Sequence, residues 1–208
     1  MMNIAIIDYD CGNIQSLTNA IEYLGYEVNL VNNPNELYKY NKLILPGVGS
    51  FDSGVSSLLK TGLFDEIINW VENEENKLLG ICLGMQLLCN SSEESSKNIP
   101  GLSLIDATVK SLSKYRSNNE KVPHIGWNNI TLKKTPFKSF IENTDFYFVH
   151  SFAVFVNNEN LSLAKTPFSH IYFDSIISNN RNIFGMQFHP EKSHIHGLNL
   201  LEDFFIHA

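Results

Sequence analysis

The sequence predicts a single α/β domain over residues 1–208, with a doubly wound, mainly parallel central sheet, helices on both faces and antiparallel additions in the second half. Three observations predict it. At 208 residues and 43% hydrophobic, the chain can bury the core of one domain without a linker. Short, continuously apolar runs alternate with helix-period segments over residues 3–90, as in sheets covered on both faces. After Gly101 the pieces become shorter and richer in β-forming residues.

The first half predicts alternating strands and helices. Ile4–Ile7 forms the first strand, residues 13–24 carry apolar side chains at helical spacing, and Gly25 ends that helix. The remaining elements of this half are strands at 28–31, 43–45 and 78–81, helices at 52–59 and 63–74, and a polar loop at 90–100.

The second half contains β-rich pieces at residues 102–112, 125–132, 146–156, 161–163, 171–173, 175–178 and 183–188. Asparagine-rich breaks at 157–160 and 178–180 predict hairpin turns. The chain closes with a helix over His194–His207, whose apolar residues fall on one stripe.

Composition excludes several classes of partner. The formal charge of −7, without a Lys/Arg cluster, argues against binding nucleic acid or an anionic membrane. No apolar run approaches membrane-spanning length, and the N-terminus lacks a cleavable apolar stretch, so we expect a cytoplasmic protein. Three irregularly spaced cysteines fit a reducing compartment. Neither Cys-x-x-Cys nor His-x-x-x-His zinc spacing occurs, and no metal or cofactor is predicted.

Cys82 lies where Leu78–Ile81 predicts a strand and Met85–Leu88 predicts the first turn of a helix. Gly80 and Gly84 remove side chains that would clash if the strand turned sharply into the helix, so the pattern indicates a nucleophile elbow with an exposed sulfur. The helix start would favour the thiolate, and the backbone N–H after the sulfur could donate to an oxyanion. Taken alone, the pattern is more typical of a buried structural cysteine.

The segment Phe188–Lys192 can supply a base and its orienter. Pro190 favours an extended His189, and residues two apart on an extended segment point the same way, so Glu191 can reach the imidazole. A carboxylate on one ring nitrogen fixes the tautomer and leaves the other nitrogen to take the Cys82 proton. The strand predicted at 183–188 puts this segment at a carboxyl edge, where open α/β sheets build sites. An ordinary surface turn is the alternative.

Two further segments could lie near Cys82. Pro46–Phe51 follows a strand, and its two glycines would let backbone N–H groups approach a ligand and donate to an oxyanion, although they also suit a simple tight turn. His150 interrupts the strand-like run Tyr147–Phe152. Burial statistics favour a core histidine at that position.

These motifs resemble the class I (triad) glutamine amidotransferases. The resemblance rests on residues 80–86, Gly-Ile-Cys-Leu-Gly-Met-Gln, together with Phe188–Glu191. Five segments narrow it to the glutaminase subunits of imidazole glycerol phosphate synthase, from histidine biosynthesis: residues 8–13, 46–51, 122–128, 148–151 and 189–193. The likeness runs nearly end to end, and Pro-His-Ile-Gly-Trp-Asn at 123–128 singles out this branch.

The resemblance implies a flavodoxin-like fold and a set of site residues. Cys82 would be the nucleophile, His189 the base and acid, and Glu191 the orienter. Backbone N–H groups of Leu83, Val48 and Gly49 would form the oxyanion hole. The glutamine would be framed by Gln86, Glu94, His150 and Ser151, and the partner surface would include Asn13, Trp127, Tyr147 and Lys192.

The implied activity is glutamine hydrolysis through a thioester, without a cofactor. Ammonia would pass along an enclosed path to a (β/α)8 cyclase in a heterodimer, which would make imidazole glycerol phosphate and aminoimidazole carboxamide ribotide. Two alternatives are a glutaminase subunit feeding a related synthase in sugar modification and a stand-alone cysteine glutamyl hydrolase. A catalytically dead binding module is disfavoured because all three triad residues are present.

Three positions depart from the family pattern. Asp10 stands where glycine is usual, Phe152 where tyrosine is common, and Asp106-Ala107 where Pro-Gly is usual. These departures bear on the fine tuning of the interface and of glutamine binding more than on the chemistry.

Overall fold

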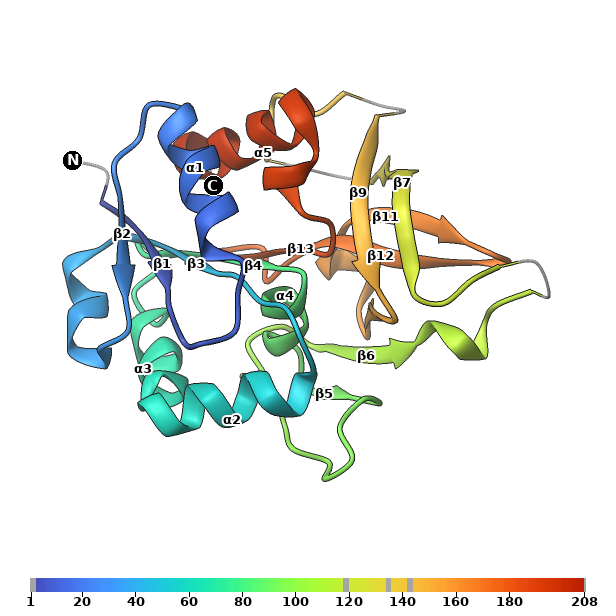
Figure 1. Ribbon diagram of the computed structural model, residues 1–208, viewed down its shortest axis with the longest axis horizontal. Coiled ribbons are helices and arrows are strands. Elements are labelled where there is room, and N and C mark those ends of the chain that lie inside the picture. Colours follow the sequence, from blue (N-terminus) through green and yellow to red (C-terminus); the bar gives the residue numbers. More distant parts are fainter. Residues whose placement is uncertain (1–2, 118–119, 134–135, 142–143, 208) are drawn as a thin grey trace.

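The computed structural model describes residues 3–117, 120–133, 136–141 and 144–207, with helices above and below a central sheet (Figure 1). The strands of the first half are β1 (Ile4–Ile7), β2 (Val28–Val31), β3 (Lys42–Leu45) and β4 (Lys77–Ile81). Its helices are α1 (Ile14–Tyr23), the 3₁₀ helix η1 (Pro34–Lys39), α2 (Phe51–Thr61), α3 (Leu63–Trp70) and α4 (Leu83–Leu87).

The second half adds mostly strands. They are β5 (Ser91–Ser92), β6 (Ala107–Ser111), β7 (His124–Asn129), β8 (Thr131–Leu132), β9 (Asp145–His150), β10 (Phe152–Val156), β11 (Ser162–Phe168), β12 (Ile171–Ser178) and β13 (Ile183–Met186). Its helices are the 3₁₀ helices η2 (Leu112–Lys114), η3 (Glu159–Leu161) and η4 (Pro190–Lys192), and α5 (His194–His207).

The main sheet has the order β2-β1-β3-β4-β13-β12-β10-β6-β5, with β11 pairing β12 and β8. The first five strands in this order run parallel to one another. β12, β10 and β6 continue the sheet by antiparallel pairing. The predicted mainly parallel sheet with antiparallel additions in the second half is therefore confirmed.

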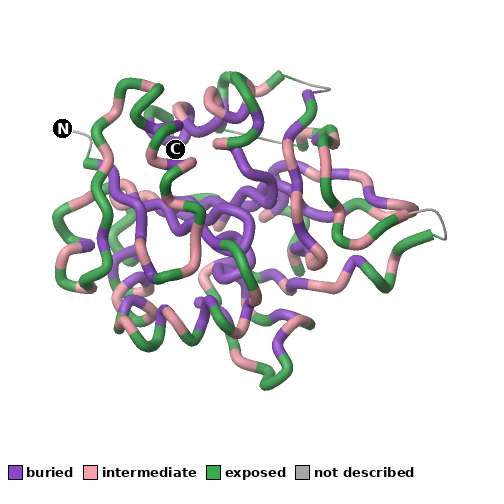
Figure 2. Tube along the Cα trace, in the orientation of Figure 1, coloured by how far each residue is buried: buried purple, intermediate pink, exposed green. Residues whose placement is uncertain are grey.

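Alternating side chains of the parallel strands divide the core between the two faces. On β1, Ile4 and Ile6 belong to the apolar cluster that includes α1 and α5, whereas Ala5 and Ile7 belong to the cluster that includes α2 and α3. Burial is concentrated in the central strands (Figure 2). Because β1, β3, β4 and β13 are covered on both faces, their sequences are nearly continuously apolar, whereas edge strand β2 exposes Asn29 and Leu30.

Two details of the second half differ from the sequence prediction. Residues 157–160 do not close a hairpin, because β10 pairs with β6 and β12 while β11 pairs with β12 and β8. The pieces predicted at 171–173 and 175–178 form one strand, β12. Asp174, which falls between the two predicted pieces, stays buried within β12 because it accepts the Val156 N–H at 2.8 Å and lies 3.6 Å from Lys165 Nζ.

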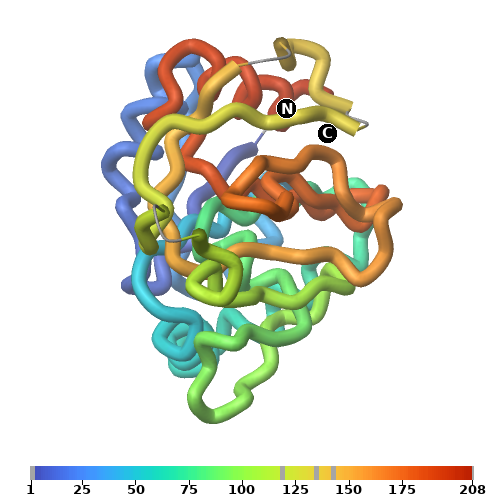
Figure 3. The backbone as a smooth tube through the Cα atoms, turned by 90° about the vertical axis from the view of Figure 1, so that its right-hand side faces the viewer, coloured from blue at the N-terminus to red at the C-terminus, as the bar shows by residue number. Residues whose placement is uncertain are grey.

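A separate two-stranded sheet of β7 and β9 flanks the main sheet, as the turned view shows (Figure 3). Its antiparallel register places Trp127 opposite Tyr147 and His124 opposite His150. No helix among the described residues is long and apolar enough to cross a membrane.

Candidate active site

Cys82 lies on a strained turn between β4 and α4. Its backbone has φ 54° and ψ −108°, a conformation that side-chain-bearing residues rarely adopt. A Cβ on Gly84 would lie 1.8 Å from the Leu45 carbonyl oxygen, and one on Gly80 would lie 2.7 Å from the Gly84 backbone. The two glycines therefore allow the sharp turn that the sequence predicts. The sulfur is less open than predicted, because Cys82 is only 6% exposed.

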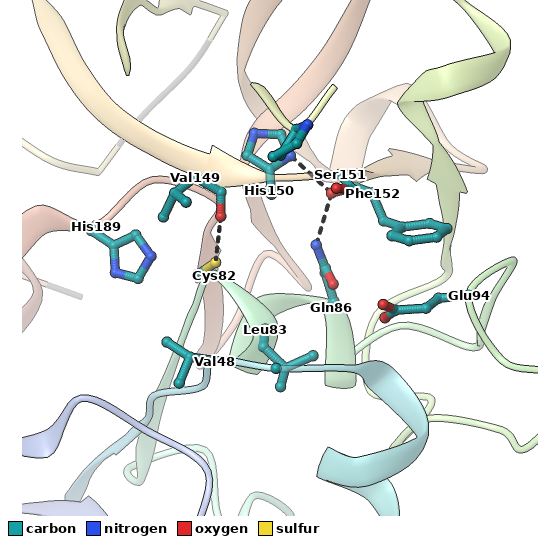
Figure 4. A pocket seen from close by; sticks show the side chains of 12 residues that line it. Val48, Cys82, Leu83, Gln86, Glu94, Val149, His150, Ser151, Phe152 and His189 are labelled. Atoms are coloured by element: carbon teal, nitrogen blue, oxygen red, sulfur yellow. Dashed lines mark hydrogen bonds between the residues drawn. The ribbon is translucent and has the colours of Figure 1, made fainter. Parts of the chain in front are cut away.

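The helix after Cys82 is short. α4 has five residues, little more than one turn, and it begins directly after the sulfur-bearing residue. Two other groups lie within sulfur hydrogen-bonding range. The Cys82 thiol donates to the Val149 carbonyl oxygen at 4.0 Å, as drawn in Figure 4, and the Gln187 side-chain N–H donates to Sγ at 3.9 Å.

His189 and Glu191 form a buried ion pair. The distance from His189 Nδ1 to Glu191 Oε1 is 2.8 Å, and each side chain is 4% exposed. The pair forms although the segment is not extended, since Pro190 begins the 3₁₀ turn η4. Burial lowers the pKa of His189, but interactions with Cys82 and Glu191 outweigh it and raise that pKa well above its usual value.

The backbone of His189 is fixed by strand β9. Its N–H donates to the Tyr147 carbonyl at 2.9 Å, and its carbonyl accepts from Ser193 Oγ at 2.6 Å. Ser193 Oγ in turn accepts from the Tyr147 N–H at 3.0 Å. Ring orientation and backbone position are therefore both determined, which is what a proton-transferring group requires.

A cavity of about 290 Å³ opens beside the sulfur. Its size is near the lower end of the range for ligand sites, roughly 300–1,000 Å³. Nine residues predicted for the site line it: Val48, Gly49, Cys82, Leu83, Gln86, Glu94, His150, Ser151 and His189. Glu191 is the exception, because it borders a much smaller recess on the other side of His189, together with Asn13 and Pro46.

The polar residues of the cavity are held by hydrogen bonds. Gln86 Nε2 donates to the Phe152 carbonyl at 2.9 Å and to Gln187 Oε1 at 3.2 Å, so its oxygen is the group left for a ligand. Glu94 accepts from the Phe51 N–H at 2.7 Å. Burial raises the pKa of Glu94, and this hydrogen bond partly opposes the shift. Burial lowers the pKa of His150 to about 3, so its imidazole is neutral.

The loop from Pro46 to Phe51 is anchored at both ends. The buried Tyr9 hydroxyl donates to the Pro46 carbonyl at 2.6 Å, and Glu94 accepts from Phe51 at the other end. Between these anchors Gly49 has φ +107°, and a Cβ there would meet nothing within 4 Å. The orientation of the Val48–Gly49 peptide therefore depends on a backbone conformation that glycine permits.

The four residues predicted for a partner surface lie outside the cavity. Trp127 is 46% exposed, stacks on His194 with ring centroids 4.8 Å apart, and meets the Tyr147 ring at 5.9 Å. Asn13 is exposed at the N-terminus of α1, and exposed Lys192 ends η4.

The structure shows how two of the residues that depart from the family pattern, Asp10 and Asp106, fit their positions. Asp10 adopts φ 64°, a left-handed conformation that glycine would occupy freely and aspartate tolerates. Asp106 Oδ1 accepts from the side-chain amides of Asn90 and Asn157, each at 2.8 Å, and so ties two loops together.

Several residues that contact the site are not among those predicted from the sequence, namely Tyr9, His124, Val149, Gln187 and Ser193. One signal was available for Gln187: it is the polar residue in an otherwise apolar run and lies two positions before His189. Val149 contributes its carbonyl oxygen, which no side-chain pattern reveals.

The arrangement can perform acyl transfer. A thiol and an imidazole border one cavity, a carboxylate is hydrogen-bonded to the imidazole, and the first N–H groups of α4 have no partner within the helix. The described residues include no cluster of three or more His, Cys, Asp or Glu that could hold a metal ion.

Comparisons with known proteins agree with this chemistry. Residues 5–208 match the family described as glutamine amidotransferase class-I. The chain is 45% identical to imidazole glycerol phosphate synthase subunit HisH 2 of Methanococcus maripaludis, over 99% of its length and 100% of that protein. It is 42% identical to imidazole glycerol phosphate synthase subunit HisH of Caldanaerobacter subterraneus, over 97% of its length and 96% of that protein.

Solved structures share the fold at low sequence identity. A crystal structure of a glutamine amidotransferase matches with a TM-score of 0.74 at 18% identity, covering 98% of this chain and 96% of that one. PurLQS from Thermotoga maritima matches with a TM-score of 0.74 at 19% identity, covering 98% of both chains.

The elbow generates a prediction about stability. Gly84→Ala should reduce the free energy of unfolding by more than about 3 kcal/mol, because its Cβ would overlap the Leu45 carbonyl. Gly25→Ala is the control: its φ of +84° strains alanine by about 1–2 kcal/mol, but its Cβ meets nothing within 4 Å. Urea unfolding measures both, and equal losses would show that the elbow can relax.

Proposed function

The chain belongs to the class I glutamine amidotransferase family, and from this premise we propose that it is the glutaminase subunit of an imidazole glycerol phosphate synthase in histidine biosynthesis. It hydrolyses glutamine to glutamate and ammonia and passes the ammonia to a cyclase. The observation that carries the proposal is that Cys82 and His189 border one small cavity, with Glu191 paired to His189, in a chain 45% identical to such a subunit.

The first half of the reaction forms a thioester. Cys82 transfers its proton to His189 Nε2, and the ion pair with Glu191 stabilises the resulting imidazolium. The thiolate attacks the carboxamide carbon of glutamine, and the negative charge on the carbonyl oxygen is held by N–H groups of Leu83, Val48 and Gly49. The imidazolium then protonates the leaving nitrogen, so ammonia departs and a glutamyl thioester remains.

The second half hydrolyses the thioester. Neutral His189 removes a proton from water, and the hydroxyl adds to the thioester carbonyl. Collapse of this intermediate expels the Cys82 sulfur and yields glutamate. Gln86, Glu94, His150 and Ser151 frame the substrate, with the Glu94 carboxylate and the Gln86 oxygen suited to the ammonium group of glutamine.

Ammonia is useful only if it stays unprotonated, so we expect a partner that encloses its path. A (β/α)8 cyclase docks in a heterodimer on the surface that includes Asn13, Trp127, Tyr147 and Lys192. Two features support this surface: Trp127 is 46% exposed and its ring meets that of Tyr147, and the Tyr147 backbone bonds to both His189 and Ser193. Contact with a partner can therefore influence the catalytic histidine directly.

The remaining expectations follow from the same proposal. Residues 1–208 act as one amidotransferase domain, since the family match extends over 5–208. The cytoplasm suits the chain because its three cysteines are free thiols.

The role of Cys82 in releasing ammonia can be tested separately from the synthesis that uses the ammonia. Cys82→Ser should abolish synthesis with glutamine, because the thiolate acts only in releasing ammonia, while synthesis with added ammonium salt should remain within about twofold of the parent. The assay is product formation by the complex with a cyclase and acceptor. Loss of both reactions would indicate that Cys82 is needed for folding or docking instead.

Substitutions in the triad should differ in how much glutaminase activity they remove and in how they change its pH dependence. His189→Asn should lose as much glutaminase activity as a Cys82 variant, since base and nucleophile act as a unit, whereas Glu191→Gln should keep measurable activity. Glu191 helps to raise the pKa of His189, and the imidazolium is lost as pH rises through that pKa. The alkaline decline of the pH–rate profile should therefore move to lower pH in Glu191→Gln. Small, equal losses at His189 and Cys82 would refute the assignment.

The partner should switch the subunit on. In the isolated chain we expect the Val48–Gly49 peptide to be turned away from the oxyanion until a partner docks. Turnover should then be about 10²–10³ lower than with cyclase and acceptor, because one oxyanion donor is absent. Gly49→Ala should prevent that activation while leaving cyclase affinity within about threefold, because alanine disfavours φ +107° yet its Cβ meets no atom within 4 Å. Gly25→Ala, remote from the cavity, is the control. Equal turnover of the parent chain with and without cyclase would favour a stand-alone hydrolase.

A further inference from the structure

We propose that Gln187 is a further catalytic residue, whose side-chain N–H stabilises the Cys82 thiolate and is oriented by Gln86 and the Phe152 carbonyl. The inference rests on the proposed function only in taking Cys82 as a thiolate nucleophile. It assigns a role to a residue immediately after β13 that lies outside the triad, the oxyanion donors and the residues that frame glutamine.

The backbone places Gln187 beside the sulfur. β13 runs parallel to β4, and their pairing ends with the Cys82 N–H donating to the Met186 carbonyl at 2.8 Å. Gln187 is the next residue, and its own N–H donates to the Ser175 carbonyl on β12 at 3.0 Å. The side chain is completely buried, with Nε2 3.9 Å from Cys82 Sγ. Its position is therefore determined by strand pairing on both sides.

The direction of the hydrogen bonds follows from one group that can only accept. The Phe152 carbonyl is 2.9 Å from the Gln86 amide, so the Gln86 nitrogen must face it. The second hydrogen on that nitrogen then points to Gln187, 3.2 Å away, which requires the Gln187 oxygen to face Gln86. Consequently the Gln187 nitrogen, with its hydrogens, faces the sulfur.

A second chain of bonds fixes the same carbonyl from the other side. His150 Nδ1 donates to the Phe152 oxygen at 2.8 Å, so its Nε2 must accept from His124 Nδ1 at 3.2 Å. His124 Nε2 then accepts from the Asn128 amide, also at 3.2 Å. The low pKa of His150, caused chiefly by burial, agrees with this neutral tautomer. The anchor of the Gln86–Gln187 chain is thus held from two sides.

An N–H donor has a specific effect on the sulfur. The Val149 carbonyl accepts from the thiol and so stabilises the protonated form. Gln187 supplies a neutral side-chain N–H donor at Sγ, in addition to the His189 imidazole that interacts with Cys82, and such a bond strengthens when the acceptor becomes an anion. Burying the Gln187 amide at this apolar strand end is unfavourable unless its polar atoms form hydrogen bonds. Its oxygen accepts from Gln86, and its nitrogen donates to the sulfur.

The test is the pH dependence of Cys82 alkylation by iodoacetamide, followed by mass spectrometry of the Cys82 peptide. The titratable groups facing the sulfur are His189 and Tyr9, with Glu191 and His150 acting on His189, and all remain unchanged in the variants. Gln187→Met should shift the midpoint of the alkylation curve upward by about one pH unit, the size expected for losing a hydrogen bond to a charged group.

Gln187→Glu is the sharper variant because it keeps the side-chain shape and the oxygen that accepts from Gln86. It replaces the N–H that faces the sulfur with a carboxylate oxygen and adds a negative charge beside it, so the midpoint should rise further than in Gln187→Met.

Glutaminase kcat should fall at neutral pH and recover partly at higher pH in Gln187→Met. A purely structural residue would lower activity equally at every pH.

Asn182→Leu is the matched control. Asn182 is a buried amide just before β13, where its side chain donates to the Val71 and Asn76 carbonyls at 2.8 and 3.1 Å, away from the sulfur. Its loss should lower the melting temperature without moving the alkylation midpoint. Unchanged midpoints in both Gln187 variants would overturn the inference. A shifted midpoint in a chain that never releases glutamate would instead retain the inference and remove the glutaminase proposal.

Discussion

The parallel pairing of β4 with β13 is the constraint on which the site depends. It joins segments that lie about a hundred residues apart in the chain and ends at Met186 and Ile81, so that Cys82, Gln187 and His189 emerge together at one edge. Glycines oppose each other in this pairing, at Gly80 and Gly185. A Cβ on Gly185 would lie 2.6 Å from the Met85 side chain, so this close contact between sheet and α4 exists only because the position carries no side chain. The register that builds the core therefore also sets the geometry of the nucleophile.

Sequence patterns predict those parts of the molecule that local chemistry determines. Continuous apolar strands indicate the buried parallel sheet, and the glycines around Cys82 indicate the elbow, because both signals lie within a few residues. Asp174 lies between two pieces that were predicted separately but form one strand. Its partners there are Val156 and Lys165, which only the folded sheet brings near. Pattern alone also treated His150 as a core histidine and Glu94 as part of a polar loop, since their place in the cavity depends on strand pairing across the second half.

The site combines rigid and adjustable parts. His189 is fixed at its ring and at both backbone polar groups, and the Gln86–Gln187 chain is anchored on a strand carbonyl. The Pro46–Phe51 loop is also fixed at its ends, by Tyr9 and Glu94, but its centre passes through Gly49. A change of the Val48–Gly49 peptide can therefore occur without moving the nucleophile or the base. Under the proposed function, this division suits an enzyme whose chemistry waits for a partner, because only the proposed oxyanion donor has to respond.

Many of the decisive groups are backbone atoms, and this explains why departures from the family pattern can be tolerated. Phe152 replaces a common tyrosine, yet its carbonyl is the atom that accepts from Gln86 and His150, and a carbonyl is the same in either residue. Asp10 replaces glycine at φ 64°, where the demand is on the backbone and aspartate can meet it at modest strain. Gln187 is the opposite case, because its function would reside in the side-chain N–H. Substitutions there should therefore be the more restricted, although the side chain is completely buried and its place in a strand-like run suggests only packing.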